Sequence, residues 1–126
     1  AKAHIREQMI DSTGATSMES INLIKKSLGE TKSFLDVKSD VSWCKDNYYQ
    51  YANRIAHLYY LREINHIDAH LLFIYFLNDE SVSNNETITD WKNAIDDVYK
   101  RLNLAKQNKL SKYIHHVYID TNKFKI

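Results

Sequence analysis

Four polar residues whose side chains could act on one ligand recur within a tyrosine-rich stretch of the sequence: Gln50, Asn53, Arg54 and His57. At about 100° per residue, an α-helix gathers all four within about 100° of arc, and nearly every other direction is apolar or aromatic. A solvated helix face is usually built from Lys and Glu, whereas amide, guanidinium and imidazole groups hold fixed hydrogen-bonding geometries. The pattern therefore favours a binding stripe. The alternative is a half-exposed helix whose polar face meets water.

The histidines and the cysteine outside this stripe give weaker indications of a metal site. His115 and His116 are neighbours in a predicted strand, so their side chains point to opposite faces and cannot chelate one ion. His66 and His70 are spaced for one helix face but flank the apparent end of a helix, and structural zinc normally has four ligands. Cys44 is expected to be a small apolar filler.

The elements that must position these residues follow from the hydrophobic pattern. It predicts helices at about 17–35, 46–64 and 88–103, and strands at about 1–6, 69–77 and 113–120. Residues 16–19 (TSME) match a capping box with Thr16 as the cap of the first helix. The run at 71–77 is apolar without a break, which is typical of a strand covered by helices on both faces. Strands alternating with helices indicate a three-layer α/β architecture.

Length and composition limit the class of protein. The 126 residues fit one domain with a single core, and the net charge of +1 provides no global attraction for nucleic acid or anionic lipid. A nucleic-acid partner would therefore need a local patch. One cysteine excludes an internal disulfide and favours a cytoplasmic location. The longest apolar run is too short to span a bilayer, so no membrane association is expected. Because the sequence begins in a predicted strand without Met, we interpret it as the C-terminal part of a longer domain.

Four segments carry a resemblance to a known family: AKAHI at 1–5, TGAT at 13–16, YYQYANRIAHLY at 48–59 and FIYFLND at 73–79. They are similar to a group of uncharacterised bacterial proteins that resemble the PD-(D/E)XK nuclease superfamily. The tyrosine-rich segment is the most specific of the four. The resemblance implies a restriction-endonuclease-like core, in which helices flank a mixed sheet, with further N-terminal strands preceding residue 1.

The resemblance also implies roles for particular residues. Lys2 resembles the catalytic lysine of the (D/E)-x-K motif, with Ala1 as the middle residue. Gln50 resembles the glutamine that several branches of the superfamily place on a helix after the catalytic strands. The acidic ligands of Mg²⁺ would lie upstream of residue 1, and the ion would activate a water molecule. Arg54 could then pair with a phosphate, with Asn53 and His57 beside it as substrate-binding residues.

The sequence therefore predicts metal-dependent hydrolysis of nucleic-acid phosphodiester bonds by the intact protein. Without the upstream carboxylates, residues 1–126 alone are expected to lack Mg²⁺-dependent cleavage. One alternative is a non-catalytic module in which the same stripe recognises nucleic acid or a protein. A structural or interaction domain inside a larger system is a third class. If the first interpretation holds, the four stripe residues should line one cleft, and Lys2 should point towards it.

Overall fold

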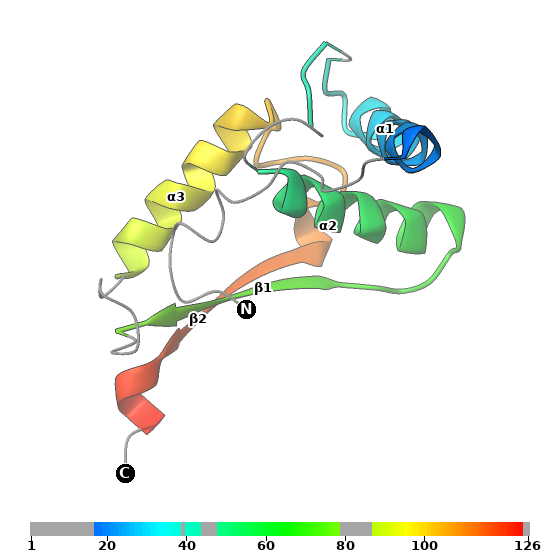
Figure 1. The fold of residues 1–126 in the computed structure, drawn as a ribbon. Helices are drawn as coiled ribbons and strands as arrows, with labels where there is room; N and C mark the ends of the chain where they lie inside the picture. Colours follow the sequence, from blue (N-terminus) through cyan, green and yellow to red (C-terminus); the bar gives the residue numbers. More distant parts are fainter. Residues whose placement is uncertain (1–16, 39, 44–47, 79–86, 125–126) are drawn as a thin grey trace.

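The computed structural model describes residues 17–38, 40–43, 48–78 and 87–124, which form a mixed α/β arrangement (Figure 1). Its main elements, in chain order, are α1 (Met18–Phe34), α2 (Tyr49–Tyr59), β1 (Leu71–Leu77), α3 (Ile88–Arg101) and β2 (Ile114–Asp120). A π-helical turn, Tyr60–Ile64, extends α2, and 3₁₀ turns at Ser111–Tyr113 and Thr121–Phe124 flank β2. These bounds confirm five predicted elements. The predicted strand at 1–6, with Lys2, and Cys44 lie outside the described residues.

The two long helices begin with side-chain caps. α1 is capped by Ser17, whose Oγ accepts a hydrogen bond from the Ser20 amide at 3.1 Å. The expected cap at Thr16 is therefore wrong by one residue, because Ser17 offers the same hydroxyl one position later. At the start of α3, the Thr87 hydroxyl accepts from the Asp90 amide and the Asp90 carboxylate accepts from the Thr87 amide. Both halves of a capping box are thus present.

α1 and α3 end without glycine. Asp36 and Asn103 follow the last helical residues and adopt left-handed backbone angles, with φ of 60° and 51°. After α3, the Leu104 amide donates to the Tyr99 carbonyl at 2.9 Å, which satisfies a carbonyl that the helix leaves open. The same arrangement closes α1. Asp and Asn tolerate this conformation better than other side chains, so a chain with only two glycines can still stop its helices sharply.

β1 and β2 pair in parallel, in a register that sets Leu71 opposite Ile114 and Leu77 opposite Asp120. α3 lies between the two strands in the chain, so β1, α3 and β2 form a β–α–β unit. Parallel pairing keeps register partners on the same face. Residues 71, 73, 75 and 77 therefore share a face with residues 114, 116 and 118.

Only one face of this strand pair is covered by the described helices. In Figure 1, α1, α2 and α3 all lie on the same side of β1 and β2. Phe73 and Tyr75, on that side, are 5% and 0% exposed, whereas Leu72, on the other, is 54% exposed. The expectation that helices cover both faces of residues 71–77 is therefore wrong for this part of the chain. An unbroken apolar run is compatible with one covered face, because half of its residues suffice to build the core.

An aromatic layer joins the helices to the strands. Tyr51 of α2 stacks on Phe73 of β1, and Tyr75 of β1 packs against Trp91 of α3 at 4.6 Å between ring centroids. Trp43 Nε1 donates to the Leu102 carbonyl at 2.9 Å and so ties the segment after α1 to the end of α3. Much of the tyrosine-rich segment is therefore core. Over the described ranges, no helix is long and apolar enough to cross a membrane.

Candidate functional site

The stripe of polar residues predicted on the second helix is present on α2. Its four members are all exposed. The residues that α2 buries lie on the opposite side of the helix: Tyr51, Ala52, Ile55, Ala56 and Leu58. Stacking of the buried side on β1 therefore turns the polar stripe outward, as the helical periodicity predicts.

Three of the four stripe residues meet at one hollow, here named the α2 cleft. Asn53, Arg54 and His57 line it, together with Ser27 of α1, Tyr60 and Leu71, and its volume is about 280 Å³. Gln50, one turn earlier on the helix, is not among the lining residues. The structure thus brings together the three predicted substrate-binding residues and leaves Gln50 outside the cleft. The position of Lys2 relative to the cleft falls outside the described residues.

A short hydrogen bond connects the α2 side of this cleft to α1. The Tyr60 hydroxyl donates to Glu30 Oε2 at 2.5 Å, which links the end of α2 to α1. This bond to a carboxylate raises the pKa of Tyr60 above its ordinary value. In the described part of the chain, no ion pair joins Arg54 to a carboxylate. Its guanidinium therefore faces the cleft region as an uncompensated charge, a group well suited to phosphate.

A second hollow, the α3–β2 cleft, was not predicted from the sequence. Its volume is about 530 Å³, and its lining residues come from α3, the turn after it, the 3₁₀ turn before β2 and β2 itself. They include the cations Lys92, Lys106 and Lys112 and the aromatic residues Tyr99 and Tyr118. Lys106 forms an ion pair with Asp96, another lining residue. No local sequence motif predicts this cleft, because its lysines lie in three separate segments.

A chain of polar groups runs from the α3–β2 cleft into the core. His116 lines the cleft, and its Nε2 lies 2.9 Å from the Tyr51 hydroxyl, which in turn donates to the Tyr99 hydroxyl at 3.3 Å. Burial, with smaller contributions from the charges of His115 and Lys106, lowers the pKa of His116 to about 4. Burial also raises the pKa of Tyr51 and of Tyr99. All three groups are neutral at pH 7, so the positive charge of this cleft comes from its lysines.

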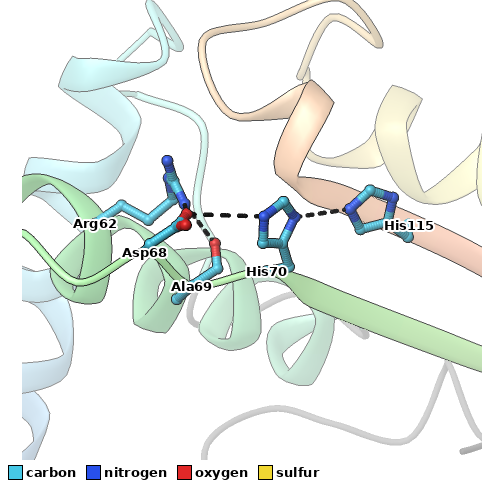
Figure 2. A network of polar contacts seen from close by, with 5 residues as sticks. All are labelled: Arg62, Asp68, Ala69, His70 and His115. Atoms are coloured by element: carbon cyan, nitrogen blue, oxygen red, sulfur yellow. Dashed lines mark hydrogen bonds and ion pairs between the residues drawn. The ribbon is translucent and has the colours of Figure 1, made fainter.

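The structure confirms the prediction for one of the two histidine pairs, His115 with His116, but not for the other, His66 with His70. His115 and His116 point to opposite faces of the strand pair, as expected; His116 faces the helices, whereas His115 is exposed. His66 and His70 do not share a helix face, because helical structure ends at Ile64 and His66 has a left-handed φ of 54°. Instead, His70 Nδ1 lies 2.9 Å from His115 Nε2 (Figure 2).

The carboxylates that could hold Mg²⁺ do not gather in the region that the structure describes. Within it, no group of three or more His, Cys, Asp or Glu side chains is placed to hold a metal ion. Asp68 pairs with Arg62, Asp96 pairs with Lys106, and Asp90 caps α3. These residues do not fit a Mg²⁺ site. The ligands expected upstream of residue 1 are not part of the described structure.

No family model, curated protein or solved structure matches this chain. The resemblance to PD-(D/E)XK nucleases therefore stays a prediction.

Proposed function

We propose that this protein binds nucleic acid and that the α2 cleft holds a phosphate of the nucleic-acid backbone. One observation carries the proposal: Asn53, Arg54 and His57, three side chains with directional donors, line the same cleft from one helix face. Arg54 supplies a permanent charge and a forked pair of N–H donors, which match two phosphate oxygens. The Asn53 amide and the His57 imidazole supply further donors beside it.

The size of the α2 cleft favours one group of a polymer over a whole small molecule. Small-molecule pockets usually enclose about 300–1,000 Å³. The volume of this cleft, about 280 Å³, lies just below that range. A phosphate on a strand that crosses the surface needs no larger space. Because the net charge is only +1, we expect few phosphate contacts and modest affinity.

Binding of labelled oligonucleotides, single-stranded and duplex, tests this proposal by fluorescence anisotropy at several salt concentrations. Arg54→Gln should weaken binding by about tenfold or more, as expected for loss of a charge-assisted hydrogen bond, and should reduce the slope of log K against log salt by about 1. Arg101→Gln, at an exposed position on α3, is the matched control and should bind like the wild type. Equal binding by both variants would contradict the proposal.

We extend the proposal to metal-dependent hydrolysis by the intact protein, with Lys2 and Gln50 as its catalytic residues and Mg²⁺ as its cofactor. This extension rests on the residues that resemble PD-(D/E)XK nucleases. Because the described carboxylates do not form a Mg²⁺ site, its ligands must come from other residues of the intact protein.

Cleavage of labelled nucleic acid by the intact protein, with and without Mg²⁺, tests the extension. Lys2→Ala should abolish cleavage, and the exposed control Lys100→Ala should not. Absence of cleavage would favour the non-catalytic module, and equally strong cleavage by Lys2→Ala would contradict the catalytic role of Lys2.

A second candidate function is binding of a small anionic ligand in the α3–β2 cleft. Its volume of about 530 Å³ lies within the usual range of ligand pockets, and three lysines stand beside aromatic side chains there. Adenosine monophosphate, which joins an aromatic ring to a phosphate, is a suitable calorimetric probe. Lys92→Gln should weaken its binding severalfold, whereas Lys100→Gln should have no effect. No measurable binding by the wild type would remove this candidate.

A further inference from the structure

We propose that His70 and His115 form a binding site for a divalent transition-metal ion, with Cu²⁺ the tightest-bound. The site is independent of the nucleic-acid function proposed above and of any Mg²⁺ ion. Its two nitrogen donors, His70 Nδ1 and His115 Nε2, lie 2.9 Å apart although their residues are 45 positions apart in the sequence (Figure 2).

The strand register explains why these two side chains meet. His115 is the register partner of Leu72, and His70 lies two residues before Leu72. Side chains two residues apart along a strand point to the same face, so His70 and His115 are diagonal neighbours on one side of the parallel pair. That side is the one that the described helices leave uncovered. Ions and water can therefore reach the pair, in which the His70 side chain is 46% exposed.

The separation of the two nitrogens suits a metal chelate. Bonds from imidazole nitrogen to a first-row metal measure about 2.0–2.1 Å; two such bonds at a right angle set the nitrogens about 2.9 Å apart, and a tetrahedral angle sets them about 3.3 Å apart. The spacing of 2.9 Å between His70 and His115 matches the right angle of square-planar or octahedral coordination. A small increase in the distance between the two nitrogens would admit a tetrahedral ion such as Zn²⁺. In either case the ion replaces the proton that now joins the two rings.

A carboxylate lies near Nε2 of His70, the ring nitrogen that the metal would leave free. Asp68 Oδ1 lies 3.8 Å from His70 Nε2 and 2.9 Å from Arg62 Nη1. The hydrogen bond from Arg62 fixes the position of this carboxylate. An anion beside Nε2 favours the tautomer that carries its proton there, and this leaves the lone pair of Nδ1 free for a metal.

The Arg62 side chain that fixes Asp68 is itself held in place. Its Nη1 also donates to the Ala69 carbonyl at 2.7 Å, and its guanidinium lies over the Tyr113 ring, 3.3 Å from the centroid. Tyr113 directly precedes β2, and Ala69 precedes His70. One arginine thus connects the segments that carry both histidines. The pair is held close to its chelating geometry before any ion binds, which reduces the ordering that binding requires.

Two protein ligands leave the other coordination positions to water, so we expect moderate affinity. The affinities should follow the usual ranking of the first-row divalent ions. Cu²⁺ should bind more tightly than Ni²⁺ or Zn²⁺.

The test is titration of the full chain with Cu²⁺, Ni²⁺ and Zn²⁺ by calorimetry, combined with electron paramagnetic resonance of the Cu²⁺ form. The wild type should bind one Cu²⁺ whose spectrum reports two imidazole nitrogens. His70→Ala and His115→Ala should each lower the affinity at least tenfold and leave at most one coordinated imidazole. His66→Ala, at an exposed histidine nearby, is the control and should behave like the wild type.

A second variant separates the metal site from a hydrogen bond that only supports the fold. His115→Gln can still hydrogen-bond to His70, but an amide is a poor ligand for these ions. It should keep the thermal stability of the metal-free wild type and lose both Cu²⁺ affinity and the rise in Tm that Cu²⁺ produces. Unchanged Cu²⁺ binding by His115→Gln and His70→Ala, or a wild-type spectrum without two imidazole nitrogens, would overturn the proposal.

Discussion

Tyr51 and Phe73 lie face to face, with their ring centroids 4.2 Å apart and their planes 3° apart. This stack fixes the first turn of α2, the helix that carries Asn53, Arg54 and His57, against β1. Since Tyr51 projects from the opposite side of α2, the contact that builds the core also directs the polar residues outward. The orientation of the α2 cleft therefore depends on an apolar contact that takes no part in binding.

Truncating the two neighbouring residues of β1 should have very different effects. Phe73→Ala should lower the free energy of unfolding by about 3–5 kcal/mol, because it leaves a cavity under α2. Leu72→Ala should lower it by less than about 1 kcal/mol, because Leu72 is already 54% exposed. Chemical denaturation of both variants gives these values. Similar losses at the two positions would mean that both faces of β1 are covered.

The positions of the helices and strands could be predicted from the sequence because they depend on local periodicity. The boundaries of α1, α3, β1 and β2 follow from capping residues and from the switch between helical and extended patterns. Which face of the strands the helices cover was not predictable in the same way. Residues 71–77 are apolar on both sides, and the sequence cannot tell which side a helix will cover.

The candidate sites were predictable only where one element forms them. The stripe on α2 was found because a single helix carries it. The pairing of His70 with His115 depends on the register of two strands, and the lysines of the α3–β2 cleft come from three segments. No spacing along the chain encodes such relationships. In the sequence, His70 has a helical spacing only to His66, and both lie beyond the predicted end of the helix at about residue 64, so nothing along the chain pointed to His115.

Two tyrosine hydroxyls in the core should respond oppositely to removal. Tyr75 is fully buried, and its hydroxyl has no hydrogen-bond partner in the described structure. Tyr75→Phe should therefore raise the free energy of unfolding by about 1 kcal/mol, because it removes an unsatisfied buried group. Tyr51→Phe should lower it by about 0.5–1.5 kcal/mol, because the Tyr51 hydroxyl contacts both His116 and Tyr99. Thermal or denaturant unfolding of the two variants measures both changes, and a loss of stability in Tyr75→Phe would contradict this assignment.

Stability should fall on acidification because of His116. Its pKa is about 4 in the folded protein against an ordinary value of 6.5, and burial is the main cause. Well above pH 6.5 the imidazole is neutral in both states, so it adds no pH dependence there. Between pH 6.5 and 4 the unfolded chain takes up a proton that the folded protein does not, so the free energy of unfolding decreases as the pH falls.

The variant His116→Gln isolates this contribution. Unfolding measured across the same pH range should show a shallower slope for His116→Gln than for the wild type, whatever the overall stability of the variant. Asn53→Gln, at an exposed position on α2, carries no titrating group; it is the control and should keep the wild-type slope. Parallel curves for the wild type and His116→Gln would show that His116 titrates alike in both states.

Amide chemical-shift mapping with an unlabelled oligonucleotide tests the central claim most directly, because it distinguishes the two clefts in a single titration. In the ¹⁵N-labelled protein, we predict that the largest shifts occur at Asn53, Arg54 and His57 and at Ser27 across the α2 cleft, and that they disappear in Arg54→Gln. Shifts centred on Lys92, Lys106 and Lys112, or an unchanged pattern in Arg54→Gln, would contradict nucleic-acid binding at the α2 cleft.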